Sequence, residues 1–255
     1  MKILLITQDE PFYLAESINY LLNRLPVDTQ VVGCCLFDVS PFGKKESFID
    51  KAIKTYKVFG AKFFLYYAVK FVLNKLSPNR SVLKTLKKQD VPVIRLEQHI
   101  NHPESIDLLK SYESDLLISI AGNQIFKKPI IELAPKGCLN LHTALLPKYR
   151  GLMPTFWALK NNEKYTGVSV FFVDEGIDSG PIIVQKKIDI TNIINQSQLI
   201  KHSKIIGMDA IIEAINLIQN GDYQLIENDD SKMTYYSFPE RQDVIDFLKK
   251  GKRFY

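Results

Sequence analysis

Asn140 and His142 are the residues whose types and spacing point most directly to chemistry. They lie two positions apart in the run CLNLH, so on a β-strand both side chains point to the same side. Leu139 and Leu141 then point to the other side, which we expect to be core. An amide can donate a hydrogen bond to a developing oxyanion, and an imidazole can relay protons at neutral pH. The alternative is a hydrogen-bonded core pair without a chemical role.

A second candidate region is the acidic, glycine-containing segment VDEGIDSGPII, residues 173–183. Gly176 and Gly180 allow positive φ and a close approach of the backbone to a flat polar heterocycle. Asp178 is suited to orienting His142 or to moving protons through water. The alternatives are a tight acidic turn or a cation loop, although the acids lack the alternating spacing and terminal Glu of a calcium loop.

Several other kinds of site are disfavoured by the sequence. The segment TQDEPFY after the first apolar run has no glycine, whereas a dinucleotide-binding fold needs a GxGxxG turn there. This argues against an NAD-type oxidoreductase, although Gln8 can still form part of a ligand crevice. No second His or Cys lies at ligand spacing from His142 and Asp178, so we expect no metal. The absence of a GxSxG elbow argues against a serine hydrolase.

Composition narrows the class of protein further. The chain has 255 residues, 46% hydrophobic and 24% charged, with a formal net charge of +5. This charge favours an anionic small molecule at the site and falls short of a nucleic-acid footprint. The three cysteines are an odd number without a CxxC motif, which indicates a reduced, cytoplasmic setting. The N-terminal MKILLITQDE is expected to be a first strand rather than a signal peptide.

Strand-like runs alternate with helical patterns through the first two-thirds of the chain, which predicts an α/β fold with a mostly parallel sheet. Strands are expected over 2–7, 29–37, 91–96, 115–121, 137–142, 166–173 and 181–190. Helices are expected over 15–25, 103–112, 127–134 and 196–220, with a long helical region over 44–89 that is broken at 77–80. Asn140 and His142 then lie at the carboxyl edge of the sheet, where ligands bind.

The segment over 58–73, VFGAKFFLYYAVKFVL, is strongly apolar but unsuited to spanning a bilayer. Its apolar run is too short, and Lys62 and Lys70 interrupt it. We expect a packed or surface-lying amphipathic helix, with peripheral membrane contact as the alternative. The region over 44–89 is expected either to cover the site or to form part of an interface, which leaves a homodimer open.

The C-terminal part is expected to form an extension of the main domain. DYQLIE and KMTYYSF are expected to pair as a hairpin. A last helix is expected in SFPERQDVIDFLKKG, where Ser237 and Glu240 have capping-box spacing and Gly251 lies just beyond the end. We therefore expect a catalytic domain over 1–190 and a helix, hairpin and helix extension over 191–255.

Four motifs together resemble the folate-dependent formyltransferase family. They are Asn140-x-His142, the following LLPKYRG, Asp178 in DEGIDSGPII, and the upstream AGNQIF. The resemblance implies an enzyme with a Rossmann-like domain, helices on both faces of the sheet, and 10-formyltetrahydrofolate as the formyl donor to an amine. It implies that Asn140, His142 and Asp178 are catalytic. It also implies a backbone cradle for the pterin, made by Ala121, Gly122, Asn123, Gln124, Ile125, Asp174, Glu175, Gly176 and Ile177.

The chemistry of the three side chains agrees with this implication. Attack of an amine on a formyl carbon produces a tetrahedral oxyanion, to which Asn140 can donate. His142 can add a hydrogen bond or accept the amine proton. Asp178 can hold His142 and shuttle protons through water to the departing folate nitrogen. The sequence leaves open which residue takes the proton first.

The acceptor is narrowed by features of the family that the sequence lacks. Members that formylate initiator tRNA add a C-terminal nucleic-acid-binding barrel, for which too few residues follow the helix expected over 196–220. Members that formylate glycinamide ribonucleotide have a glycine-rich loop after the first strand, and deformylating members have an N-terminal regulatory domain. By elimination, the chain is similar to sugar N-formyltransferases, which act on nucleotide-linked amino sugars for O-antigen and lipopolysaccharide.

The C-terminal run TYYSFPERQDVIDFLKKGKRF is most similar to branch members that handle GDP-linked 4-amino-4,6-dideoxy sugars such as perosamine. A GDP- or dTDP-linked amino sugar and a folate are therefore the expected partners, without nucleic acid or a membrane span. Two alternatives remain open. One is formylation of another amine, on methionyl-tRNA or glycinamide ribonucleotide, and the other is a non-catalytic protein that binds folate or a nucleotide sugar.

The loop after Pro147 is expected to contact the acceptor. Lys148 and Arg150 suit a diphosphate, with Tyr149 between them, and solvated loop charges are the alternative. Trp157 is a candidate to stack on a sugar or base, although an aromatic residue at the start of a helix more often packs in the core.

Overall fold

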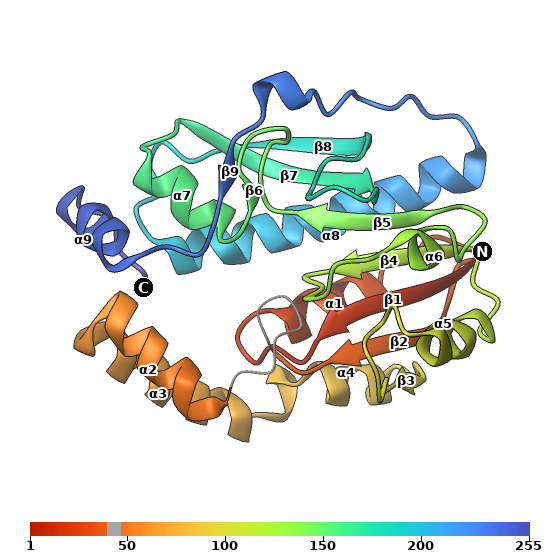
Figure 1. Cartoon of the computed structure of the whole chain (residues 1–255), viewed down its shortest axis with the longest axis horizontal. Helices are drawn as coiled ribbons and strands as arrows, with labels where there is room; N and C mark the ends of the chain where they lie inside the picture. The colour runs from red at the N-terminus through yellow and green to blue at the C-terminus, as the bar shows by residue number, and fades with distance from the viewer. Residues whose placement is uncertain (40–46) are drawn as a thin grey trace.

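A seven-stranded sheet forms the centre of the computed structural model, which describes residues 1–39 and 47–255 (Figure 1). Its strands are β1 (Lys2–Gln8), β2 (Gln30–Phe37), β3 (Val93–Ile94), β4 (Leu116–Ile120), β5 (Cys138–His142), β7 (Tyr165–Phe172) and β8 (Ile182–Asp189). The order is β3-β2-β1-β4-β5-β7-β8, and the first five strands are mutually parallel. Strand β7 runs antiparallel to β5 and to β8. The predicted α/β fold with a mostly parallel sheet is confirmed.

Helices cover both faces of this sheet (Figure 1). The first face is covered by α1 (Leu14–Leu22), α4 (Val82–Lys88) and α8 (Gln196–Asn220), and the second by α5 (Pro103–Lys110) and α6 (Lys128–Ile131). Along β1, Ile3 and Leu5 enter the first core, whereas Leu4 and Ile6 enter the second. Because both faces are buried, a continuous apolar run such as KILLIT forms a central strand.

The helical region between β2 and β3 breaks at 77–80, as predicted, and also at Gly60, which was not predicted from the sequence. Helix α2 (Phe48–Phe59) and helix α3 (Ala61–Leu76) meet at Gly60, whose φ of 85° suits glycine. A single 3₁₀ turn over Pro78–Arg80 separates α3 from α4. Residues 44–46 of the predicted region lie outside the described residues. Within 1–39 and 47–255, no helix has both the length and the apolarity needed to cross a membrane.

The predicted C-terminal hairpin is wrong. Strand β9 (Tyr235–Tyr236) pairs in parallel with β6 (Arg150–Gly151), in the loop that follows β5. Ile226, from the other half of the expected hairpin, forms a bridge with Ile182 at the edge strand β8. Both runs satisfy their backbone groups against earlier parts of the chain instead of against each other.

The last helix, α9 (Arg241–Lys249), begins later than the sequence suggested. Its N-cap is Glu240, whose backbone N–H donates to the Asp243 carboxylate at 2.8 Å. Ser237 therefore does not cap the helix, because an acidic pair one turn further on supplies the capping box. Gly251 lies just past the helix end with a φ of 74°, as predicted.

Helix α8 belongs to the cover of the central sheet. It packs on β7 and β8 and also contacts α1 and helix α7 (Pro154–Lys160). The division of the chain at residue 190 stays a prediction.

Candidate active site

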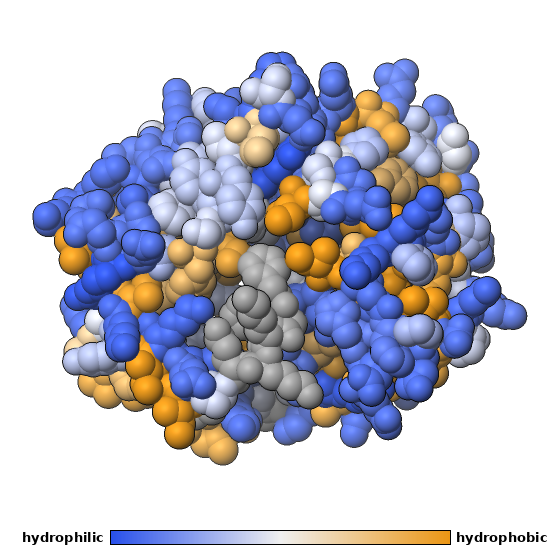
Figure 2. Space-filling view, viewed as in Figure 1, coloured by the Kyte–Doolittle hydropathy of each residue, from blue (hydrophilic) through white to orange (hydrophobic). Residues whose placement is uncertain are grey.

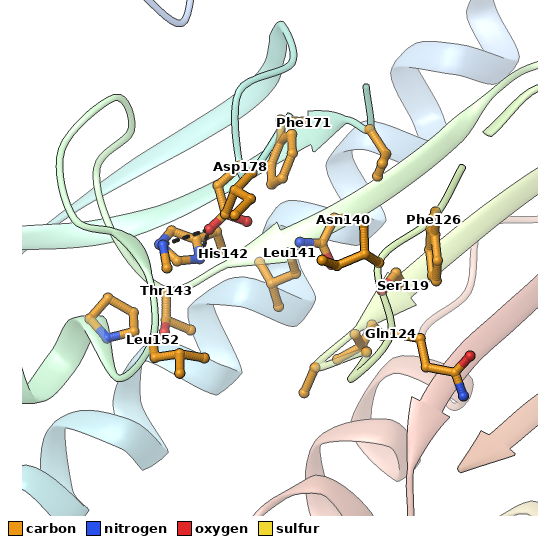
Figure 3. Close-up of a pocket in the computed structure, with 18 of the residues that line it drawn as sticks. Ser119, Gln124, Phe126, Asn140, Leu141, His142, Thr143, Leu152, Phe171 and Asp178 are labelled. Atoms are coloured by element: carbon orange, nitrogen blue, oxygen red, sulfur yellow. Dashed lines mark hydrogen bonds and ion pairs between the residues drawn. The ribbon is translucent and has the colours of Figure 1, made fainter. Parts of the chain in front are cut away.

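A cavity of about 350 Å³ opens at the carboxyl ends of β1, β4 and β5 (Figure 3). The loop after β7 and the start of α7 form its opposite wall. The predicted site residues that line it are Gln8, Ala121, Gly122, Gln124, Ile125, Asn140, His142, Asp174, Gly176, Ile177 and Asp178. The structure thus brings together predicted residues from four separate segments of the chain, at the position where α/β folds bind ligands.

Asn140 lies on the wall formed by β5. Its Cα pairs with Ser119 of β4 and with Phe171 of β7, so the side chain stands over the middle of the sheet. Figure 3 shows the amide nitrogen on the side that faces His142 and Asp178. No hydrogen bond joins this side chain to any residue of 1–39 or 47–255, and a ligand in the cavity can therefore receive its N–H.

His142 is held at both ring nitrogens. Its Nε2 lies 2.7 Å from the carbonyl oxygen of Tyr149, and its Nδ1 lies 3.6 Å from Oδ2 of Asp178 (Figure 3). A carbonyl can only accept, so Nε2 carries a hydrogen. Nδ1 is then the ring nitrogen with a free lone pair, and it faces the Asp178 carboxylate.

Asp178 is fixed by its own backbone and by two neighbours. Its φ is 50°, in the left-handed region, and its carbonyl oxygen accepts from Nδ2 of Asn228 at 2.9 Å. The backbone N–H of Gly151 donates to Oδ2, also at 2.9 Å. The side chains of Asp178 and His142 are only 13% and 8% exposed, so their interaction is little screened by solvent.

The loop after β4 has the character of a backbone cradle. In the part of the chain that the structure describes, the backbone groups of residues 122–124 make no hydrogen bond. Ala121 has a φ of 55°, and a Cβ at Gly122 would lie 2.6 Å from Oγ of Ser119. Free amide and carbonyl groups beside a narrow cavity suit the edge of a flat heterocycle, so the residues fit a pterin.

Two residues of the expected cradle do not line the cavity. The side chain of Asn123 is buried and donates from Nδ2 to the carbonyl oxygen of Asp38, at the end of β2. Glu175 is exposed at the tip of the loop after β7. The side chain of Gln124 accepts from the Ile100 N–H, so this residue can offer mainly its backbone.

The expected acceptor contacts of the loop after β5 need correction. Arg150 is 5% exposed, pairs with Asp230 at 2.7 Å and donates to Asn228. Its guanidinium is therefore already engaged by the C-terminal segment and supports the loop rather than binding a diphosphate.

The two aromatic residues of this region are also internal. The Tyr149 hydroxyl donates to Glu163 at 2.6 Å, and burial together with this bond raises the pKa of Tyr149. Trp157 is buried and its Nε1 donates to the carbonyl oxygen of Ser237. Lys148 is exposed but does not line the cavity.

Lys204 is a site residue that sequence reasoning missed. It lies on α8, lines the cavity, and forms no ion pair with any described residue. Burial lowers the pKa of Lys204, while the charge of Glu10 acts in the opposite direction. A sequence signal existed, because Lys204 continues at helical spacing the buried stripe that includes Met208 and Ile211. A lysine on an apolar stripe needs either a partner or a ligand.

The combination of an amide donor with an imidazole–carboxylate pair suits acyl transfer to a nucleophile. A family model described as formyl transferase matches residues 69–215, and the chain belongs to this family of formyl-transferring enzymes. It is 37% identical over 171 residues to a methionyl-tRNA formyltransferase of Kosmotoga olearia, covering 67% of this chain and 54% of that protein. The chain spans about half the length of the curated relatives that it matches.

Two solved structures share the fold. One is the N-formyltransferase from Helicobacter canadensis in complex with folinic acid and dTDP-3-aminofucose, with 21% identity and a TM-score of 0.58, covering 95% of this chain and 72% of that chain. The other is glycinamide ribonucleotide transformylase 1 from Symbiobacterium toebii, with 17% identity and a TM-score of 0.62, covering 89% of this chain and 94% of that chain.

Proposed function

We propose that this protein transfers the formyl group of 10-formyltetrahydrofolate to the amine of a nucleotide-linked amino-deoxy sugar. The observation that carries formyl transfer is the shared cavity of Asn140, His142 and Asp178, with a free amide on one side and a braced imidazole–carboxylate pair on the other. No group of three or more His, Cys, Asp or Glu residues suited to a metal occurs among the described residues, and the proposal uses none.

The folate supplies the transferable formyl carbon. The cavity-lining residues of the two segments would hold the pterin, through backbone groups at the first segment and the loop wall at the second. They are Ala121, Gly122, Gln124 and Ile125 in the first segment and Asp174, Gly176 and Ile177 in the second. Asn140 donates to the oxygen that becomes negative when the amine adds. One such donor typically contributes about 3 to 4 kcal/mol to stabilising the transition state.

His142 and Asp178 transfer the proton of the attacking amine in this proposal. His142 Nδ1 accepts a proton from the amine, directly or through water, and Asp178 stabilises the resulting imidazolium. Nε2 keeps its bond to the Tyr149 carbonyl throughout, so the ring does not turn. The same proton can then pass through water to the departing folate nitrogen, which closes the cycle without a net change at the protein.

The sugar acceptor is supported by two observations. The C-terminal run resembles the branch that handles GDP-linked amino sugars, and the similar Helicobacter canadensis structure is a complex with dTDP-3-aminofucose. Lys204 adds a cation at the cavity wall for an anionic substrate. A cytoplasmic location and a role in O-antigen synthesis are part of this proposal.

Methionyl-tRNA is the second candidate acceptor, because the curated relatives carry that name. Purified protein should be incubated with 10-formyltetrahydrofolate and, in turn, with UDP-, dTDP- and GDP-linked amino sugars and with initiator methionyl-tRNA. Mass spectrometry of the products distinguishes the two, because one formyl group adds to a single acceptor class. Product on tRNA alone would replace the sugar proposal, and binding without any product would replace both with a non-catalytic protein.

A further inference from the structure

Helix α3 exposes a continuous apolar stripe. Leucine and valine side chains recur at positions i, i+4, i+7, i+8 and i+11, and each is between 53% and 76% exposed. They are Leu65, Val69, Val72, Leu73 and Leu76. At 1.5 Å per residue the stripe is about 17 Å long. Figure 2 shows hydrophobic side chains along the lower left of the molecule, over the helices labelled α2 and α3 in Figure 1.

This exposure does not arise from a helix that lacks packing. The other side of α3 is docked on the protein, where Phe63 stacks on Phe59 and contacts Phe254 edge-on. Tyr67 stacks on Phe12, in the loop between β1 and α1. The apolar stripe is therefore an additional face, which the aromatic contacts on the other side of α3 do not cover.

Helix α2 extends the same kind of surface. Ile49, Ile53 and Tyr56 recur at i, i+4 and i+7 and are 67%, 46% and 53% exposed. Tyr56 contacts Phe64 of α3 edge-on, so the two helices pack together. We refer to α2 and α3, residues 48–76, as the helical pair.

The helical pair also carries the charge of the whole chain. It contains six lysines and one aspartate, a formal charge of +5 that equals the net charge of all 255 residues. The remaining basic and acidic residues balance each other. Lys57, Lys62 and Lys75 are exposed, and their long stems can lie along apolar surface while the ammonium groups reach outward.

The charge selects the occupant of this surface. A second copy of the chain docked face to face would bring two charges of +5 together, which opposes association. Nucleic acid would satisfy the lysines but leave the aliphatic stripe in water. An anionic bilayer meets both features, because headgroup phosphates attract the lysines and the acyl boundary buries the stripe.

We propose that the helical pair is an interfacial membrane anchor, which lies flat on anionic phospholipid without crossing the bilayer. It is separate from the cavity, since no residue of 48–76 lines that site. The proposal is therefore independent of which acceptor receives the formyl group in the cavity.

Vesicle co-sedimentation of the full chain tests the proposal. We expect binding to phosphatidylcholine vesicles that contain about one-third phosphatidylglycerol, and at least about tenfold weaker binding to phosphatidylcholine alone. A triple variant, Lys57→Gln with Lys62→Gln and Lys75→Gln, should lose about tenfold or more in affinity for the anionic vesicles. Leu73→Ser with Leu76→Ser should also lose about tenfold, because less apolar area enters the boundary.

Matched controls use the same substitutions elsewhere. The exposed lysines Lys87, Lys110 and Lys136 changed to Gln, and Val27→Ser with Leu108→Ser, should leave vesicle binding within about twofold of the wild type. Equal loss in the controls, or no binding to anionic vesicles, overturns the proposal. Two other results also overturn the proposal. One is a dimer in lipid-free solution that the Leu73→Ser, Leu76→Ser variant dissociates. The other is RNA binding that this variant leaves unchanged, together with no binding to vesicles.

Discussion

Asp178→Asn is the substitution that tests the proposed chemistry most directly. Asparagine has the same shape, and its carbonyl oxygen can still accept the Gly151 N–H that now binds Oδ2 at 2.9 Å. The change therefore removes one charge next to His142 and little else. We expect the free energy of unfolding to change by less than about 1 kcal/mol.

The expected loss of rate follows from the distance between the two groups. With His142 protonated, Nδ1 and the Asp178 carboxylate are 3.6 Å apart, and both side chains are nearly buried. At an effective dielectric constant of about 20, opposite unit charges at this distance attract by about 4 to 5 kcal/mol. If the transition state carries the imidazolium, losing that attraction lowers kcat by about a thousandfold.

The fall in kcat is measured by steady-state and single-turnover formylation of the nucleotide-linked amino sugar that the wild type formylates fastest. A fall in kcat with a nearly constant KM is expected, because the pair acts when charge develops and not when the substrate binds. Asp209→Asn, the same substitution on the exposed side of α8, is the control and should behave like the wild type. A folded Asp178→Asn protein with kcat within about tenfold of the wild type would show that the pair does not carry the proton.

Three further predictions use other parts of the structure. Asn228→Leu leaves the carbonyl oxygens of Asp178 and Gly180 without their donor, so the free energy of unfolding measured in urea should fall by about 2 to 4 kcal/mol. An unchanged free energy of unfolding would show that Asn228 does not stabilise this loop. Lys204→Met should raise KM for one anionic substrate about tenfold while kcat changes little, and unchanged KM for both substrates contradicts that role. Burial raises the pKa of Cys138 to about 12, so the folded state holds this proton while the unfolded state loses it above about pH 9. Stability should therefore fall above pH 9 by about 1.4 kcal/mol per pH unit from this thiol, and Cys138→Ala should fall less steeply in urea denaturation at pH 8 and 10.

The parts of the site that follow local rules were predictable from the sequence. Asn140 and His142 share a side of β5 because strand side chains alternate, and the core positions of Leu139 and Leu141 are confirmed. Their place at the carboxyl edge follows from the alternation of strands and helices. The partner of His142 Nε2 was not predictable, because it is the backbone carbonyl of Tyr149, and any residue type could supply it.

The failures come from contacts between distant parts of the chain. Arg150 appeared to be a free cation for a diphosphate, but Asn228 and Asp230 surround it from a segment far along the sequence. The run around Tyr235 has a period suited to a strand, yet periodicity does not identify the partner strand. Charge and strand propensity are local properties, whereas pairing depends on which backbone groups remain free after the sheet has formed.

The same long-range contacts make the C-terminal segment part of the site. The Thr234 hydroxyl accepts from the Tyr149 N–H at 2.8 Å, and the Tyr236 carbonyl accepts from the Leu152 N–H at 2.8 Å. These bonds set the position of the loop whose Tyr149 carbonyl holds the imidazole of His142. The segments up to residue 190 contain Asn140, His142 and Asp178, but the bonds that fix the loop carrying the Tyr149 carbonyl come from residues 234–236. The orientation of the His142 imidazole therefore depends on the sheet and on the C-terminal segment together, because residues 234–236 hold the loop that carries the Tyr149 carbonyl.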